Sequence, residues 1–406
     1  MIKWESRKYI TDPYRTRFEA DVVERIDGDA PAVVLSETYF YPESGGQPCD
    51  LGTIGGKKLV DVQERPEDGA VVHSLVELPQ GDRVDCEIDW PRRLDHMQQH
   101  SGQHMLSAAL LRKHEAQTLS FHLGSTISTI DLDRSLDLNA CVEAEGLVNA
   151  VIQKGVSIQS RLVSGTGDLD ELELRKAPPE SDELRIVTIS DFDQQACCGT
   201  HPANAAEVGV VMVRSVENYK GGCRVSFVCG NRARRDYRES VDNLRAVAAE
   251  LSSAEADTAV TVQRLLADKK QLGKDLAKLD TELVRFHAEE WFADATRLGA
   301  IDALSKVLDA GEVQSPGSLR TAALHLVARP NRIVLLGTLS GGRAHLVFAR
   351  SKDGDADMGA LLRSVVYMVD GKGGGSAELA QGGGPKTEGL TEAMAEALDQ
   401  TKRSLA

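Results

Sequence analysis

Two pairs of candidate metal ligands stand out in the sequence, and the members of each pair are four residues apart. The stretch DHMQQHSGQHMLSAAL contains His100 and His104, and the stretch QQACCGTHPAN contains Cys197 and His201. Residues four apart lie on one face of a helix, so the first two imidazoles can hold one ion between them. Zinc favours tetrahedral sites made of thiolate sulfur and imidazole nitrogen. The sequence therefore predicts one zinc site with these four side chains as ligands.

Two neighbouring residues leave the ligand set open. Cys198 offers an alternative thiolate beside Cys197, and His96 offers an imidazole one helical turn before His100. We interpret His96 as a surface residue, with a hydrogen-bond donor to a ligand as the alternative. A metalloprotease with this histidine spacing needs a glutamate where Ser101 stands, so that class is disfavoured. Four protein ligands would close the site, whereas catalysis needs an exchangeable position, and the sequence leaves this choice open.

The helix that carries the first pair is the central element of the predicted fold. Pro91 can start it, and good helix formers continue to about Lys113 with Leu94, Met97, Leu106 and Leu110 available for a buried face. Before it, residues 1–90 alternate short β-like runs with turn signals, which predicts a small β-barrel. Residues 91–232 are predicted to form a mixed α+β domain that holds the zinc. We expect strands at 116–132, 157–163, 184–190 and 207–229, and a second helix at 139–154.

From about residue 236 to 288 the pattern is that of a long helix. Its apolar residues recur mostly three and four apart, which is typical of a coiled-coil seam: Val262, Leu265, Leu272, Leu276, Leu279, Leu283 and Phe286. We predict a helical hairpin or a dimerisation stalk over 233–295, with helix packing inside one chain as the equal alternative. Residues 296–406 are predicted to form a C-terminal α/β domain. In it, IVLLGTL and AHLVFAR read as buried strands, and GKGGGSAELAQGGGPK as a glycine-rich loop before a final helix.

The composition fits a folded protein without membrane spans. Its 406 residues are 41% apolar, no apolar run approaches the roughly 20 residues that span a bilayer, and the start is too charged for a signal peptide. The formal net charge of -15 argues against coating of nucleic acid by bulk positive charge. Any RNA contact would be local, at the cluster of Arg232, Arg234, Arg235 and Arg238, for which a solvated helix face is the alternative.

The seven cysteines are too sparse for a disulfide framework, so we expect a reducing, cytoplasmic location. Five of them have no metal-like partner nearby in the sequence and are predicted to be small buried or half-buried residues. These are Cys49, Cys86, Cys141, Cys223 and Cys229.

Taken together, these motifs resemble the editing domain of alanyl-tRNA synthetases and of the free-standing AlaX proteins, which is marked by H-x-x-x-H followed far downstream by C-x-x-x-H. The stretch TYFYPESGGQPCDLGTI, from Thr38 to Ile54, resembles the barrel signature of that family, and ENYKGGCRVSFVCGNRA resembles its closing segment. The C-terminal part, with GGGSAELAQGGG, is similar to the DHH-associated domain of the synthetases. There the family more usually has Arg-Pro-Asp where Ser376-Ala377-Glu378 stand. The resemblance covers nearly the whole chain and is to the long AlaX form.

The resemblance implies a trans-editing hydrolase that deacylates mischarged tRNA(Ala), chiefly Ser-tRNA(Ala) and also Gly-tRNA(Ala), with Zn²⁺ at its centre. A site sized for alanine cannot strongly reject one added hydroxyl, so a second site that rewards the hydroxyl is the remedy. Thr38 is the candidate reader of that hydroxyl, and Gln47 the candidate for orienting the substrate or the water. Because Thr38 already belongs to the editing module, we expect no aminoacylation domain. A homodimer through the stalk or the C-terminal domain is a further expectation.

Two other classes of function compete with this interpretation. A non-catalytic, zinc-stabilised tRNA-binding protein would use the four ligands to close the site. A phosphoesterase would need a DHH motif, but Asp95-His96-Met97 lacks the second histidine and lies in the wrong domain.

Overall fold

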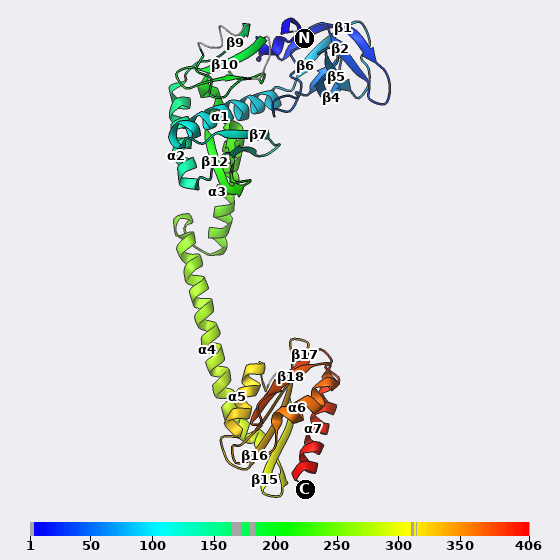
Figure 1. The fold of residues 1–406 in the computed structure, drawn as a ribbon, viewed down its shortest axis with the longest axis vertical. Coiled ribbons are helices and arrows are strands. Elements are labelled where there is room, and N and C mark those ends of the chain that lie inside the picture. Colours follow the sequence, from blue (N-terminus) through cyan, green and yellow to red (C-terminus); the bar gives the residue numbers. More distant parts are fainter. Residues whose placement is uncertain (1–3, 165–171, 179–182, 310–311, 314, 406) are drawn as a thin grey trace. The chain divides into compact units, whose positions relative to one another are not determined.

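The computed structural model describes residues 4–164, 172–178, 183–309, 312–313 and 315–405. The chain forms two compact units, Met1–Ala246 and Val247–Ala406. Each unit combines helices with sheets (Figure 1), so the predicted α+β class is confirmed. The finer division into four segments, and the stalk among them, stay predictions.

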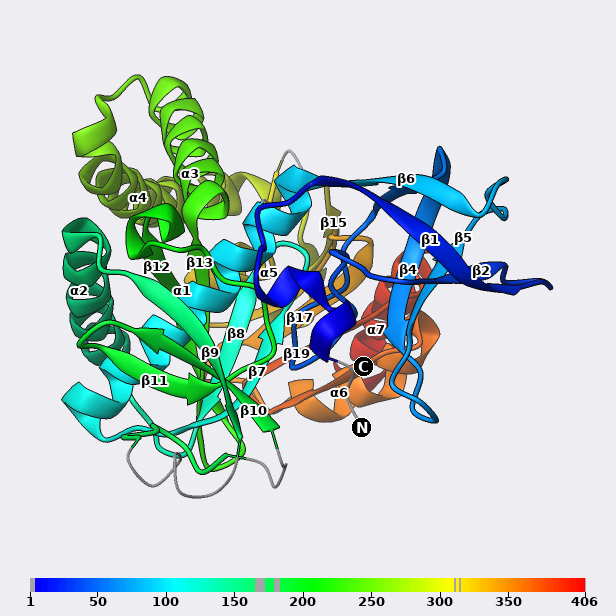
Figure 2. The same cartoon turned by 90° about the horizontal axis from the view of Figure 1, so that it is seen from above.

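A closed six-stranded barrel opens the first unit, with its strands in the order β1-β2-β5-β4-β3-β6. Alternate residues of β5 and β6 are buried, which is the period of two that a strand with one face on a core shows. The predicted barrel is thereby confirmed, and its strands lie together at the amino-terminal end of α1 (Figure 2). Its elements, after the short helices η1 (Trp4–Ser6) and η2 (Lys8–Ile10), are β1 (Arg17–Ile26), β2 (Ala32–Leu35), β3 (Gly52–Ile54), β4 (Lys57–Glu64), β5 (Val71–Leu75) and β6 (Arg83–Ile88).

Helix α1 (Trp90–His114) follows the barrel directly. The Asp89 side chain accepts a hydrogen bond from the Arg92 amide, and Pro91 occupies the first turn, where its missing N–H costs nothing. An ion pair between the fully buried Arg93 and Asp50 ties the helix to the barrel. We expected one buried face, but every residue from His96 to Leu110 is buried. The reason is that α2, β7, β11 and β13 all pack around this helix.

Two antiparallel sheets and a second helix complete the first unit. The sheets have the strand orders β12-β13-β8-β7 and β11-β10-β9, and they share a core with α1 that includes Leu106, Ile130, Val148 and Phe227. The expected strands and helix are present, whereas β11 and η3 were not predicted. The elements are β7 (Thr118–Leu123), β8 (Ser128–Leu132), α2 (Leu138–Lys154), β9 (Ile158–Ser164), β10 (Glu183–Ile189), β11 (Asp193–Ala196), η3 (Ala205–Val208), β12 (Val211–Tyr219), β13 (Gly222–Cys229) and α3 (Gly230–Glu250).

The second unit is built on one six-stranded sheet in the order β14-β15-β16-β17-β19-β18, in which only the β15–β16 pairing is parallel within the described residues. Ile333 and Leu335 of β16 pack toward α6 and α7, and Val334 and Leu336 pack toward α4 and α5. The elements are η4 (Glu255–Asp257), α4 (Thr258–Phe292), β14 (Thr296–Leu298), β15 (Ile301–Leu308), α5 (Pro316–Leu326), β16 (Arg332–Ser340), β17 (Arg343–Arg350), α6 (Met358–Val365), η5 (Val366–Val369), β18 (Lys372–Gly375), β19 (Leu379–Gly384) and α7 (Leu390–Leu405).

The glycine-rich segment is not the loop that we expected. Residues Lys372–Gly375 pair with Ala380–Gly383 as the antiparallel strands β18 and β19. Main-chain hydrogen bonds hold this hairpin, and they need no side chains. A Cβ added to Gly375 would lie 2.1 Å from the Leu379 carbonyl oxygen, and one added to Gly384 would lie 1.9 Å from the Val369 carbonyl oxygen. The glycines thus allow close backbone packing.

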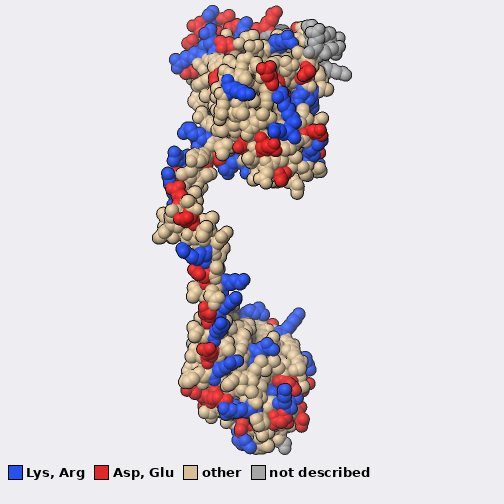
Figure 3. Space-filling model, turned by 90° about the vertical axis from the view of Figure 1, so that its left-hand side faces the viewer, with Lys and Arg blue, Asp and Glu red and all other residues tan. Residues whose placement is uncertain are grey.

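The apolar stripe of α4 is divided between two environments. Val284, Ala288 and Trp291, near the end of the helix, are buried against α5 and the sheet. The stripe residues Leu272 and Phe286 are 68% and 71% exposed within this single chain. Acidic and basic side chains are interspersed along α4 on the face drawn in Figure 3. The coiled coil and the homodimer stay predictions. None of the helices in the described ranges is long and apolar enough to cross a membrane.

Candidate metal centre and active site

Helix α1 presents His100 and His104 from consecutive turns of one face. Their rings are stacked, with centroids 5.2 Å apart, and only 3% and 4% of the two residues is exposed. The full burial of this part of α1 therefore holds two imidazoles in fixed positions inside the protein.

The second pair lies in the turn that follows β11. Arg185, itself buried, donates from Nη1 to the carbonyl oxygens of Cys197 (3.1 Å) and Gly199 (2.6 Å), which fixes the path of this turn. A Cβ on Gly199 would lie 2.2 Å from Cε1 of His100, so only glycine fits there. The turn can therefore pass directly against the α1 histidines and bring Cys197 and His201 to them.

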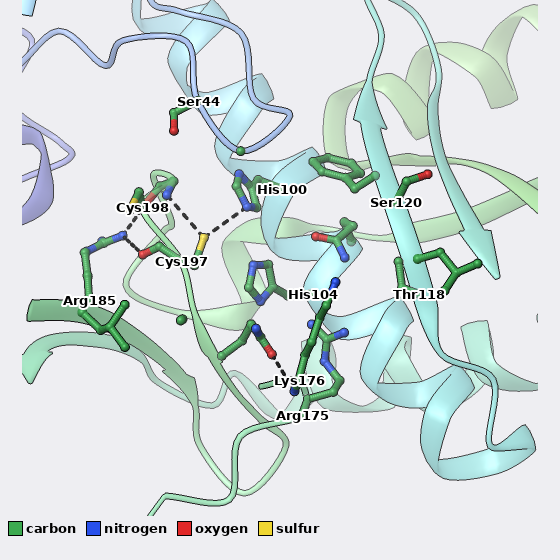
Figure 4. Close-up of a pocket in the computed structure, with 18 of the residues that line it drawn as sticks. Ser44, His100, His104, Thr118, Ser120, Arg175, Lys176, Arg185, Cys197 and Cys198 are labelled. Carbon is green, nitrogen blue, oxygen red and sulfur yellow. Dashed lines mark hydrogen bonds between the residues drawn. The ribbon is translucent and has the colours of Figure 1, made fainter. Parts of the chain in front are cut away.

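Four donor atoms, one each from His100, His104, Cys197 and His201, lie within 4.8 Å of one another. The Cys197 Sγ atom is 3.3 Å from Nε2 of His100 (Figure 4). It is also 3.3 Å from Nε2 of His201. Three imidazoles and one thiolate match the donor preferences of zinc. The structure thus brings together all four residues that the sequence singled out, in a cluster that could hold a metal ion.

Each of the three imidazoles is also held at its other nitrogen, Nδ1. The partner of His100 is the Gln47 Oε1 atom at 2.8 Å, that of His201 is the Ser101 Oγ atom at 2.8 Å, and that of His104 is an Asp193 carboxylate oxygen at 3.3 Å. Such partners fix the orientation of a metal-ligating histidine and leave Nε2 for the ion. This second set of contacts fits a metal site better than it fits three histidines that merely fill a core.

The charges around the cluster favour a thiolate. Burial opposes ionisation of the Cys197 thiol, but the imidazoles of His100, His201 and His104 outweigh it and hold the thiol pKa well below its ordinary value. Burial also lowers the pKa of His201 to about 3, against the opposing effect of Cys197. A thiolate and a neutral imidazole are the forms that bind zinc.

A cavity of about 460 Å³ opens beside the cluster. His100, His104 and Cys197 line it together with polar residues of β7, including Thr118 and Ser120 (Figure 4). Among the described residues of its lining, the basic side chains of Arg175, Lys176 and Arg185 outnumber the one carboxylate, Glu183. The cavity therefore favours an anionic ligand, which could reach the metal donors from this side.

Gln47 and Thr38, the two residues predicted to act on the substrate, lie in different places. Gln47 is fully buried, and besides His100 it contacts Thr200 through both ends of its amide. Thr38 is buried in the barrel unit, where its hydroxyl lies 2.9 Å from His73 Nε2 and accepts from the Phe40 amide. It is not among the described residues that line the cavity. The role of Thr38 as a hydroxyl reader stays a prediction.

The two alternative ligands do not join the cluster found within the described residues. Cys198 is exposed and lines the cavity. His96 is only 3% exposed, so our interpretation of it as a surface residue is wrong, because the elements packed around α1 cover that turn as well. The other five cysteines are buried, as predicted.

Sequence reasoning missed Ser101, Asp193 and Arg185 as parts of this site. Asp193 carries its own partner, since Arg175 Nε donates to its carboxylate at 2.9 Å. The hydrogen bond with His104 and the charge of Arg175 hold the Asp193 pKa below its usual value in spite of burial. A carboxylate four residues before the cysteine was the one signal that could have pointed to this contact. Nothing in the sequence marks Ser101 or Arg185.

Three family models match the chain in separate segments. Residues 8–92 match tRNA synthetases class II (A), residues 184–226 match the threonyl and alanyl tRNA synthetase second additional domain, and residues 303–404 match the DHHA1 domain. The first match covers the barrel, the second covers the turn with Cys197 and His201, and the third covers most of the second unit.

Similar proteins include both synthetases and an editing protein. The alanine–tRNA ligase of Methanopyrus kandleri is 30% identical over 405 residues, which are 95% of this chain but 43% of that protein. The alanyl-tRNA editing protein AlaX-L of Pyrococcus horikoshii is 28% identical over 392 residues, which are 93% of this chain and 94% of that protein. The C-Ala domain of Aquifex aeolicus alanyl-tRNA synthetase, a solved structure, is 28% identical and covers 28% of this chain and 97% of its own length, with a TM-score of 0.24.

The chain thus spans less than half of the ligase but nearly all of the editing protein. Along this chain the family matches run from the barrel through the second additional domain to the DHHA1 domain. Together with the histidine and cysteine cluster, these matches support the long AlaX form of the alanyl-tRNA editing proteins.

Proposed function

We propose that this protein is a trans-editing hydrolase that removes serine, and as a second substrate glycine, from mischarged tRNA(Ala) at a zinc site. The observation that carries the proposal is the cluster of His100, His104, Cys197 and His201 beside a cavity of about 460 Å³. The similar protein from Pyrococcus horikoshii is named an alanyl-tRNA editing protein, which supports the choice of substrate class.

The four clustered side chains would hold the ion through Nε2 of the histidines and Sγ of the cysteine. A bound zinc ion would supply Lewis-acid chemistry, which polarises an ester carbonyl or a water molecule. The three imidazoles are oriented by contacts at Nδ1, which come from Gln47, Ser101 and Asp193. We therefore assign Gln47 to positioning of His100, since both ends of its amide are engaged within the protein.

Residues that line the cavity could bind the terminal nucleotide of the tRNA. Lys176 is exposed at the lining, so its ammonium can meet a phosphate of the terminal nucleotide without loss of an existing partner among the described residues. The hydroxyls of Thr118 and Ser120 belong to the same lining. The predicted reader of the seryl hydroxyl remains Thr38.

A Thr38→Val protein tests that reader. If the threonine hydroxyl contacts the seryl side chain, kcat/KM for Ser-tRNA(Ala) falls by about 5- to 150-fold, because a buried hydroxyl left without its partner costs about 1–3 kcal/mol. Hydrolysis of Gly-tRNA(Ala) should stay within about twofold, because glycine has no hydroxyl to read. A thermal melt separates this effect from the loss of the buried contact with His73. Equal losses on both substrates would remove Thr38 from the account as a reader.

The direct experiment is hydrolysis of purified Ser-tRNA(Ala), with Ala-tRNA(Ala) as the control substrate. The proposal predicts rapid release of serine and little release of alanine. A second candidate, the non-catalytic zinc-stabilised tRNA-binding protein, is favoured by one observation, the presence of four protein donors that can close a zinc site. A protein that binds zinc and tRNA but cleaves neither ester would establish that alternative instead.

A further inference from the structure

A second cavity lies one helical turn before the ligand pair on α1. Its volume is about 570 Å³, and among the described residues it shares no lining with the cavity beside the metal donors. The residues that matter for its chemistry come from α1, from the turn between β7 and β8, and from the start of α3: Arg92, His96, Gly124, Arg232, Arg234 and Arg235.

The lining of this cavity is strongly basic. Among the described residues that line it there are four arginines and one carboxylate, Asp95, which is already paired with Arg232 at 2.7 Å. Arg234 and Arg235 are exposed and form no hydrogen bond or ion pair within the described part of the chain. They lie in the first turns of α3, where the positive end of the helix dipole adds to their charge. The cavity therefore favours an anion.

His96 contributes a buried imidazole nitrogen that has no hydrogen-bond partner among the described residues. Only 3% of the residue is exposed, it lines the cavity, and the nitrogen concerned is Nδ1. A buried polar atom without a partner is unfavourable, so a ligand that pairs with it would bind more tightly. Burial, and then the charge of Arg92, lower the His96 pKa to about 4, so the imidazole is neutral at pH 7 and can donate one hydrogen bond.

The two cavities flank the same short segments. Ser44 and Phe121 line the cavity beside the metal donors. Pro48 and Gly124, a few residues further along the same two segments, line the basic cavity. Along α1, His96 and His100 are separated by a rise of about 6 Å. A nucleic acid strand whose end enters the first cavity would thus pass the second cavity within a few nucleotides.

We infer that the basic cavity binds a backbone phosphodiester of the RNA substrate, through the guanidinium groups of Arg234 and Arg235 and the buried imidazole of His96. This inference rests on the proposed function, because it takes the RNA to be the tRNA that is edited. Arginine forks match the oxygens of a phosphate, and phosphate contacts position an RNA without reading its sequence.

The test measures binding of fluorescently labelled, uncharged tRNA(Ala) by anisotropy over a series of salt concentrations. For an Arg234→Ala/Arg235→Ala protein, we expect Kd to rise about tenfold at about 0.1 M salt, and the slope of log K against log salt to become shallower by about 1 to 2. The matched control is Lys154→Ala/Arg161→Ala, which removes the same charge from exposed positions of α2 and β9 outside both cavities and should leave Kd within about twofold.

A His96→Phe protein tests the contribution of the imidazole separately from that of the arginine charges. The substitution keeps a ring of similar size but removes the hydrogen-bond donor, so Kd for tRNA should rise several-fold. Because the imidazole is neutral, no charge is lost and the slope of log K against log salt should stay unchanged. Wild-type binding by the Arg234/Arg235 variant would overturn the inference, as would an equal loss in the control. Orthophosphate that binds in an Arg234- and Arg235-dependent way, while RNA binding stays at the wild-type level in the variant, would overturn it too.

The assay uses uncharged tRNA, so its outcome is independent of ester hydrolysis. A wild-type protein that binds RNA through these arginines but cleaves no ester would refute the proposed function and leave this site standing. A protein that edits normally with both arginines removed would refute only the site.

Discussion

A His100→Ala/His104→Ala protein is expected to bind no zinc and to lose hydrolysis of Ser-tRNA(Ala) by at least about 10³-fold. Both side chains are buried on one face of α1 and provide two of the four clustered donors. Two remaining donors cannot complete a tetrahedral site. A metal that polarises the reacting groups is worth several kcal/mol, and each 1.4 kcal/mol is a factor of ten in rate.

The matched control for this variant is His122→Ala, which removes an exposed histidine of β7 in the same unit. It should keep one zinc per chain and wild-type hydrolysis. Zinc content by atomic emission, a thermal melt and initial rates are measured on all three proteins. Hydrolysis that persists in a folded double variant without zinc would contradict the assigned role of the cluster.

A Gly199→Ala protein is expected to lose about 10²-fold in kcat/KM and to bind zinc more weakly, with its overall fold retained. The added Cβ would lie 2.2 Å from Cε1 and 2.5 Å from Nδ1 of His100, and 3.0 Å from the Gln47 Oε1 atom. The His100 ring cannot move aside without breaking its contact with Gln47 or leaving the donor cluster. A displacement of about 1 Å at a reacting centre can cost a factor of 10² in rate.

Gly146→Ala is the matched control, because a Cβ at this position in α2 would meet no atom within 4 Å. Helix propensity should make that variant more stable by up to about 1 kcal/mol, with unchanged activity. Activity and zinc affinity at the wild-type level in Gly199→Ala would show that the turn after β11 is not held against His100 as closely as we describe.

The sequence was sufficient to predict the elements whose signals are local. The His100 and His104 spacing, the proline start of α1 and the alternation in the barrel strands each depend on neighbours along the chain, and α1 and the barrel are present as predicted. The pairing of His100 with Cys197 could be proposed because zinc favours thiolate and imidazole donors in one tetrahedral site.

The parts that could not be predicted depend on contacts between distant residues. Gln47 and His100 are 53 residues apart, and Ser101 and His201 are 100 apart, so no periodicity relates the members of either pair. The burial of His96 follows from elements that pack around α1, not from its own turn. The glycine-rich hairpin escaped prediction because its strands depend on backbone pairing, whereas strand prediction relies on side-chain patterns.

We propose that the clustered histidines and cysteine act through zinc to remove serine from tRNA(Ala). The most direct test is to strip metal from the wild-type protein with a chelator, confirm by circular dichroism that it stays folded, and measure Ser-tRNA(Ala) hydrolysis before and after one equivalent of Zn²⁺ is returned. We predict that hydrolysis is lost with the metal and recovers with the first equivalent. A folded, metal-free protein that releases serine at the undiminished rate would contradict the account.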